Sequence, residues 1–195
     1  NGEELFELTN FKIVLEKPTY NKLPIYYYYD QEKLNRYYDK TFGAGKGLFR
    51  KPLEESRQID GMIQHILEAI DTKKQYETRR AILVVPNVIE KEKVYSPLGL
   101  VAVWVTPRVL AGKINIDYSF TWRTVEAITG LPSSMYASVT FAEEITQMIK
   151  ENAKNTDISE VVNLGHVSYI AHSLHMFLGE ERMNIVRGIV DEVSV

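Results

Sequence analysis

Two pairs of adjacent residues in this 195-residue chain have side chains suited to holding a phosphate. Arg79 and Arg80 are neighbours, and Thr124 directly follows Arg123. A guanidinium group suits phosphate because two of its N–H donors can meet two oxygens at once. The alternative is structural, since ion pairs with Glu77 or Glu126 would also satisfy these arginines. Residue type and adjacency alone favour the structural interpretation.

The chain contains no cysteine. This excludes disulfides, thiolate metal ligands and cysteine nucleophiles together. Three histidines, His166, His172 and His175, lie close in the sequence, and the last two would share a face if that segment were helical. No acidic ligand with metal-site spacing lies nearby. We therefore favour hydrogen-bonded or solvated histidines and predict no metal site.

Other catalytic patterns are weak or absent. Ser133 and Ser134 follow a proline, without the glycine-x-serine-x-glycine turn of a hydrolase nucleophile. Glu143 and Glu144 are adjacent on a predicted helix, so they point apart and indicate a solvated face. The glycine-rich segment 42–50 lacks the spacing and the following Ser or Thr of a phosphate loop, so a flexible loop is favoured.

Hydrophobic periodicity predicts a mixed α+β fold with a mostly antiparallel sheet packed against helices. Apolar residues at three- and four-residue steps predict a helix over residues 58–72 and another after Gly130. A final helix over residues 180–193 would turn Met183, Val186, Ile189 and Val190 inward. Strands are predicted over residues 11–15, 79–85, 100–106, 114–120 and 161–169, and the tyrosine run 26–29 is strand-prone.

Composition sets the outer limits. Hydrophobic residues make up 45% and charged residues 25%, and the net charge is -3. One domain over residues 1–195 can therefore bury a full core. No block of like charge favours non-specific binding of nucleic acid, and no apolar run approaches the ~20 residues of a membrane helix. We expect a cytoplasmic protein. The chain opens on Asn1, which is compatible with a piece of a longer protein.

Four passages follow one another between residues 59 and 172. They are a helix, Thr78-Arg79-Arg80 and an apolar strand; Ser96-Pro97-Leu98-Gly99 and a strand; Gly112-Lys113, a strand, Trp122-Arg123-Thr124-Val125-Glu126 and Gly130-Leu131-Pro132; and Leu164-Gly165 with Tyr169 and His172. Their order and spacing resemble the thymidylate synthase and deoxycytidylate hydroxymethylase superfamily. The resemblance implies a thymidylate synthase-like α+β fold, with residues 1–57 divergent because the family's glutamate-leucine-leucine-tryptophan helix has no counterpart.

The resemblance also locates what is lost. In that family a cysteine thiolate adds to C6 of the uracil ring, which makes C5 nucleophilic toward a carbon carried by folate. The position of this cysteine matches Leu98, and the histidine beside it matches Gly99. An alkyl side chain cannot form the adduct, so no catalytic residue is assigned and methylation by that route is excluded. Folate is implied by the resemblance alone.

The family's binding residues are better retained. Arg79 and Arg80 match arginines that reach the partner subunit's nucleotide phosphate, and Arg123 and Thr124 match a phosphate-holding pair within the subunit. For base and sugar, Glu126 matches an aspartate and Ser134 or its neighbour Met135 matches an asparagine. Tyr169 and His172 match positions near the family's ribose-contact motif.

We therefore expect a homodimer that either binds a pyrimidine nucleotide monophosphate without converting it or serves as a dimeric scaffold. The alternative is a nucleotide-modifying transferase with altered, cysteine-independent chemistry. In that case Glu126, Tyr169 or His172 would act as acid or base.

Overall fold

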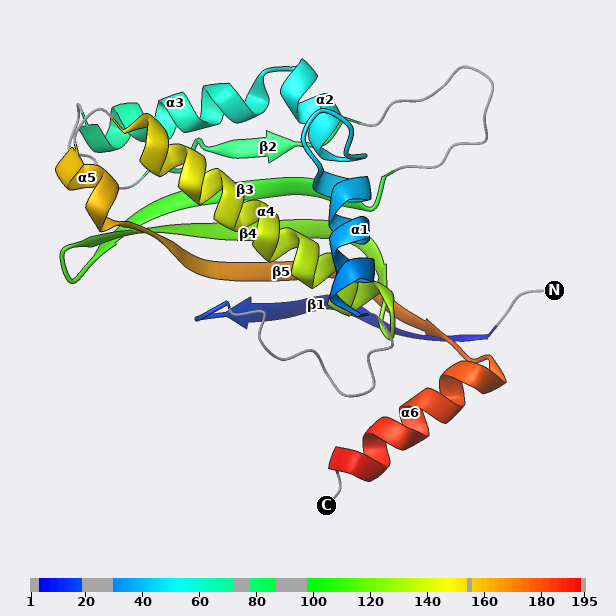
Figure 1. Cartoon of the computed structure of the whole chain (residues 1–195). Helices are drawn as coiled ribbons and strands as arrows, with labels where there is room; N and C mark the ends of the chain where they lie inside the picture. The colour runs from blue at the N-terminus through cyan, green and yellow to red at the C-terminus, as the bar shows by residue number, and fades with distance from the viewer. Residues whose placement is uncertain (1–3, 19–29, 72–77, 87–97, 154–155, 194–195) are drawn as a thin grey trace.

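The computed structural model describes residues 4–18, 30–71, 78–86, 98–153 and 156–193 (Figure 1). The predicted tyrosine strand 26–29 lies outside the described residues, as do Ser96 and Pro97 of the second motif passage. The described elements combine helices and strands, as the periodicity predicts. No described helix is both long enough and apolar enough to cross a membrane.

The described strands form one sheet in the order β1-β5-β4-β3-β2. Their bounds are Leu5–Leu15 for β1, Ile82–Val84 for β2, Leu100–Leu110 for β3, Lys113–Glu126 for β4 and Val162–Phe177 for β5. β1 pairs with β5, β2 with β3 and β3 with β4 in antiparallel fashion, whereas β4 and β5 run parallel. The prediction of a mostly antiparallel sheet is confirmed. The one parallel pair needs a long crossover, which helices α4 and α5 supply.

Some strand bounds differ from the prediction. β2 is shorter than the predicted strand 79–85, while β5 continues eight residues past the predicted end at Tyr169. The extension places His172 and His175 on a strand rather than a helix. Successive strand residues point to opposite faces, so two residues three apart do not share one. The two histidines therefore lie on opposite sides of β5.

Helices cover one face of the sheet (Figure 1). They are α1 (Gln31–Phe42), α2 (Arg50–Glu55), α3 (Gln58–Asp71) and α4 (Gly130–Asn152), with the short α5 (Thr156–Val161) before β5. Alternate residues of β4 point into this layer and are buried, among them Tyr118 and Phe120. Phe42 of α1 stacks on Phe141 of α4, and Phe120 meets both rings edge-on. This aromatic cluster joins the two layers.

The opposite face of the sheet, here called the open face, has no described helix across it (Figure 1). Its centre is a row across four strands, in which Trp104 pairs with Ser119, Ser119 with Ser168 and Ser168 with Val14. Trp104 is 43% exposed and Val14 is 45% exposed. The described helices thus bury one sheet face and leave the other uncovered.

Helix α6 (Glu180–Val193) forms where predicted. It extends away from the sheet and from the other helices (Figure 1). Of the four residues expected to face inward, three are half-buried and Val190 is 54% exposed. The contacts that fix its first turn come from Arg182, which lies 3.8 Å from Glu126 and over the ring of Phe177. An amphipathic pattern predicts a helix, but it does not say which surface the helix covers.

Candidate functional site

The position matched to the family's nucleophile lies at the start of β3 against an indole ring. Leu98 is half-buried and packs on the core, and Gly99 accepts a 2.7 Å hydrogen bond from the backbone N–H of Arg123. A Cβ atom on Gly99 would lie 3.6 Å from Cε3 of Trp122. The surroundings of Leu98 and Gly99 are therefore hydrocarbon, with no acid, base or nucleophile among these side chains.

Trp122 occupies the centre of this region. It is 3% exposed, stacks on Tyr169 with ring centroids 5.6 Å apart, and meets Phe49 edge-on at 5.4 Å. Its indole N–H is buried and donates to no described acceptor. The sequence motif places an arginine and a threonine after this residue, but Trp122 itself belongs to the aromatic core.

Tyr169 and Ser134, both predicted to contact the base or the sugar, bind each other instead. The Tyr169 hydroxyl lies 2.6 Å from Oγ of Ser134, and that Oγ donates to the carbonyl oxygen of Gly130 at 2.7 Å. Both side chains are at least nine-tenths buried. Burial raises the pKa of Tyr169 well above its usual range, although the bond to Ser134 opposes the rise. Tyr169 is thus a neutral phenol within the core.

Glu126 ends β4 and caps the start of α4. Its carboxylate accepts hydrogen bonds from the backbone N–H groups of Ile128, Thr129 and Gly130 and from the hydroxyl of Thr129. Burial alone would raise its pKa, but these four bonds outweigh burial and hold the pKa below the usual value. Glu126 is therefore ionised at neutral pH with its oxygens occupied. Such a carboxylate is a poor general acid.

At the C-terminal end of the parallel strands β4 and β5, the histidine that lies beside Thr124 is His175 and not His172. Oγ1 of Thr124 lies 3.0 Å from Nδ1 of His175, and His175 is in register with Glu126 across β4 and β5. His172 is exposed and lies 3.3 Å from Oδ1 of Asn10 on β1. The resemblance matched His172 to the family's sugar-contact motif, and the predicted strand ended at Tyr169. The continued apolar residues Ala171 and Leu174 were the signal for a longer strand.

The arginines do not converge within one chain. Arg79 and Arg80 are exposed just before β2, and neither forms an ion pair with a described acidic residue. Ile82 pairs with Trp104 and Trp104 with Ser119, which places residue 80 level with residue 117 of β4. Arg123 lies six residues further along, about 20 Å at the usual strand rise. A phosphate site using all three arginines would need a second copy of the chain.

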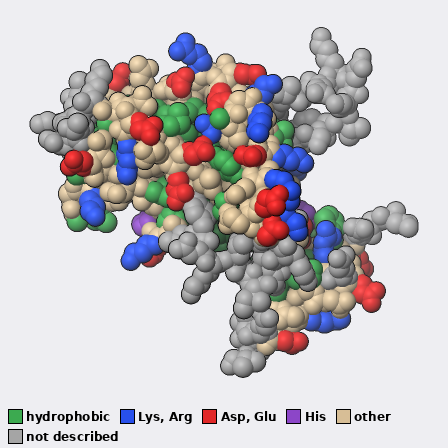
Figure 2. Space-filling view, viewed as in Figure 1, with side chains coloured by type: hydrophobic (Ala, Val, Ile, Leu, Met, Phe, Trp, Pro, Cys, Tyr) green, Lys and Arg blue, Asp and Glu red, His purple; other side chains and the backbone are tan. Residues whose placement is uncertain are grey.

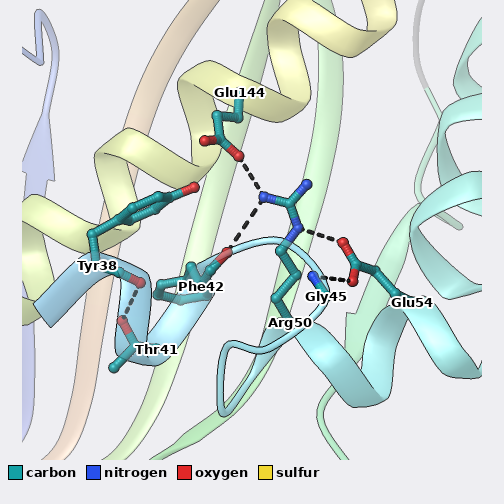
Figure 3. A network of polar contacts seen from close by, with 7 residues as sticks. All are labelled: Tyr38, Thr41, Phe42, Gly45, Arg50, Glu54 and Glu144. Atoms are coloured by element: carbon teal, nitrogen blue, oxygen red, sulfur yellow. Dashed lines mark hydrogen bonds and ion pairs between the residues drawn. The ribbon is translucent and has the colours of Figure 1, made fainter. Parts of the chain in front are cut away.

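The glycine-rich segment is closed by an ion-pair network (Figure 3). Arg50, whose side chain is 9% exposed, pairs with Glu54 and with Glu144 and donates to the carbonyl oxygen of Phe42. Glu54 also accepts the backbone N–H of Gly45 at 2.8 Å. Glu144, expected on a solvated face, is thus bound to the arginine that fastens α2 to α4.

The amides of this loop point at the protein's own acceptors. Gly47 donates its N–H to the carbonyl oxygen of Gly43 at 2.7 Å. A Cβ on Gly43 would lie 2.4 Å from the carbonyl oxygen of Asp39, and one on Gly47 would lie 2.6 Å from the nitrogen of Gly43. The glycines are therefore explained by tight packing, and these N–H groups do not form a phosphate cradle.

Within the described residues, no three His, Asp or Glu side chains are grouped as metal ligands would be. No family model matches the sequence, and no match was found among curated proteins. Among solved structures, the chain is similar to the crystal structure of thymidylate synthase from T4 phage. The TM-score is 0.55 with 12% sequence identity, over 92% of this chain and 70% of that chain. At this identity the likeness establishes the fold, so the chain has the thymidylate synthase fold without a cysteine.

Proposed function

We propose that this chain is a thymidylate synthase-like protein that does not catalyse the cysteine-dependent reaction and serves as a homodimeric scaffold. The observation that carries the proposal is the open face, a broad sheet surface without a helix over it in the described part of the chain. The other face is already packed against α1, α3 and α4. Self-association would therefore use the open face.

The position matched to the family's nucleophile supports the proposal that the chain does not catalyse the cysteine-dependent reaction. Leu98 and Gly99 present only alkyl surface and backbone, and they pack against the buried Trp122. A carbon side chain cannot add to a pyrimidine ring. Leu98 packs instead against the edge of the hydrophobic core.

The side chains of the open face support the proposal of a homodimeric scaffold. Trp104, Val14 and Val84 are each more than 40% exposed and lie on strands β3, β1 and β2 of the same sheet. By contrast, Figure 2 shows the helix-covered face with acidic and basic side chains intermixed over the helices. Tryptophan is enriched at protein interfaces, because its large flat surface gains much from burial. Two open faces packed together would cover these residues.

Sedimentation velocity over a concentration series tests the scaffold. We expect the chain to sediment at twice its 22.4 kDa mass. Trp104→Glu should shift it to the monomer mass, because each copy would bury an unpaired carboxylate. The control is Leu48→Glu, since Leu48 is 51% exposed but lies beside the helices. A monomer at all concentrations up to about 100 μM, where weak interfaces still populate dimers, would remove the scaffold proposal.

A second candidate is a pyrimidine nucleoside monophosphate held between two copies. It is favoured by Arg79 and Arg80, which are exposed without an acidic partner among the described residues. Uridine monophosphate should then raise the melting temperature of the dimer, but not that of Trp104→Glu or of the Arg79→Ala, Arg80→Ala double variant. No rise at millimolar nucleotide would eliminate this candidate.

We rank a transferase with cysteine-independent chemistry below both candidates. Glu126 uses its oxygens to cap α4, and Tyr169 is buried and bonded to Ser134. Neither group is offered to a substrate as an acid or base. Product formation from a nucleotide, abolished by Glu126→Ala without loss of folding, would reverse this ranking.

A further inference from the structure

The centre of the open face is hollowed. The hollow encloses about 470 Å³ and is lined by residues of β1, β3, β4 and β5. It follows from residue size along one row across the sheet, because small Ser119 and Ser168 lie between the larger Trp104 and Val14. Sites for small organic ligands usually have volumes of about 300–1,000 Å³. The hollow is thus large enough for such a ligand.

The hollow carries polar groups without partners. The hydroxyls of Ser119, Ser168 and Thr106 form no hydrogen bond with another residue in the described part of the chain. Three hydroxyls side by side can each donate one hydrogen bond to a common oxygen-rich group. Trp104 forms one wall and stacks on no described ring, so its indole face is accessible. The site therefore combines donors with a flat apolar surface.

Two cationic side chains, Lys12 and Arg108, line the hollow, and Asp117 is the acidic residue among the lining side chains. Asp117 already accepts two hydrogen bonds, one from the Nε–H group of Arg108 at 2.8 Å and one from the backbone N–H of His166 at 2.8 Å. Lys12 forms no ion pair with a described acidic residue. An anion in the hollow would thus meet cations and hydroxyl donors at once.

We infer that this hollow binds a small organic anion that carries a flat ring. Its anionic group would be held by Lys12, the free N–H groups of Arg108 and the serine hydroxyls, and its ring would lie against Trp104. The hollow is separate from the end of strands β4 and β5 where Glu126 lies. Ser119 and Glu126 are seven residues apart on β4, about 23 Å along the strand. It uses none of the residues matched to the family's binding motifs.

Phenyl phosphate is the probe, because it joins a ring to an anion. Its binding is followed by calorimetry and by protection of tryptophan fluorescence from acrylamide, which reaches the 43% exposed Trp104 far more readily than the 3% exposed Trp122. We expect saturable binding that weakens at least tenfold in Lys12→Ala and in Arg108→Met. Lys46→Ala, which changes an exposed lysine on the glycine-rich loop, should bind as the original chain does.

Two further probes separate the contributions of charge and ring. Inorganic phosphate and benzyl alcohol should each bind at least tenfold more weakly than phenyl phosphate. Equal binding of benzyl alcohol would overturn the anion site, and equal binding of inorganic phosphate would overturn the role of Trp104. Ser168→Leu fills the hollow without touching a charge and should abolish binding; its melting temperature and circular dichroism show whether the variant is folded.

The hollow and the proposed self-association use the same face of the sheet, because Trp104 and Val14 belong to both. The binding titration is therefore run at a concentration where sedimentation shows a single copy, and no saturable binding there at 10 mM probe, far above typical ligand affinities, would overturn the hollow. At a concentration where sedimentation shows two copies, phenyl phosphate should shift the chain toward the monomer. A monomer at all concentrations that still binds phenyl phosphate removes the scaffold alone, so the two proposals can fail separately.

Discussion

At the scale of single residues, Glu126 has the contacts of a helix cap. Its carboxylate accepts three backbone N–H groups and one hydroxyl at the start of α4. A negative charge at this end also interacts favourably with the helix dipole. The same residue type at the same motif position could serve a ligand in another protein. Here its hydrogen-bonding capacity is used within the fold.

Glu126→Ala should lower the free energy of unfolding by about 1–2 kcal/mol at pH 7, the usual cost of a lost N-terminal cap. Because folding lowers the pKa of Glu126, its stabilisation is complete above the usual glutamate pKa of about 4.3 and is lost as the pH falls through the folded-state pKa. The difference between Glu126→Ala and the original chain should therefore shrink below pH 4, as measured by urea denaturation at several pH values.

Two controls isolate this effect. Glu126→Gln keeps the size and one acceptor oxygen but cannot ionise, so its free energy of unfolding should lie between those of Ala and Glu at pH 7. Glu68→Gln changes an exposed carboxylate of α3 and should have little effect. A gap between Glu126→Ala and the original chain that is constant from pH 7 to pH 3 would contradict a capping carboxylate.

The residue scale also shows where sequence reasoning stops. The order of the motifs matched Leu98 to the family's nucleophile position, and this match stays a prediction. It could not tell that Tyr169 and Ser134 bind each other, since this contact joins β5 to α4. Nor could it show that His175, rather than His172, lies beside Thr124. That contact depends on how far β5 continues, which is set by its pairing with β1 and β4.

At the scale of elements, α2 is tied to α4 by one buried arginine. Arg50 pairs with Glu54 on its own helix and with Glu144 of α4 (Figure 3). The sequence predicted α3 and α4 from their apolar spacing, and both form. It assigned Glu144 to solvent, because the periodicity of one helix does not show that an arginine 94 residues away packs beside it.

Arg50→Met should destabilise the fold by about 2 kcal/mol, less than a fully buried ion pair would cost. The reason is that Glu54 and Glu144 are 31% and 43% exposed, so water can solvate them once the arginine is gone. The amide hydrogens of Gly45 and Gly47 should exchange faster, since the loop loses its anchor. Hydrogen exchange followed by NMR measures this.

Arg36→Met is the matched control. Arg36 also pairs with a glutamate four residues away, but both side chains are more than 60% exposed. Exposed pairs contribute about 0.2–1 kcal/mol, so this change should be nearly silent. Equal losses of stability for Arg36→Met and Arg50→Met would show that burial and the contact to α4 add nothing.

At the scale of the whole molecule, the described elements give the sheet one packed side and one open side. The α+β class and the mostly antiparallel sheet could be predicted, because local periodicity marks each element. The parallel pairing of β4 and β5 and the uncovered sheet face could not, since they depend on which elements meet. The hollow on the open face has the same origin, because Ser119 and Ser168 are unremarkable in sequence and become neighbours only across the sheet.

Helix α6 gives the last prediction, that a chain shortened to end at Gly179 keeps the fold. Arg182 in the first turn of the helix contacts Glu126 and Phe177 at the end of the sheet. The backbone bond from Leu178 to Glu4, which closes the end of β1 and β5, remains in the shortened chain. Exposed ion pairs and single cation–π contacts each contribute about 1 kcal/mol or less. The melting temperature should therefore fall by only a few degrees, about what 1 kcal/mol costs a domain of this size.

A chain that instead begins at Glu16 lacks β1 and exposes the edge of β5, and we expect it to lose the fold. If the chain that ends at Gly179 also loses the fold, α6 belongs to the core. If it keeps its melting temperature but no longer sediments as a dimer, the helix serves the assembly rather than the fold.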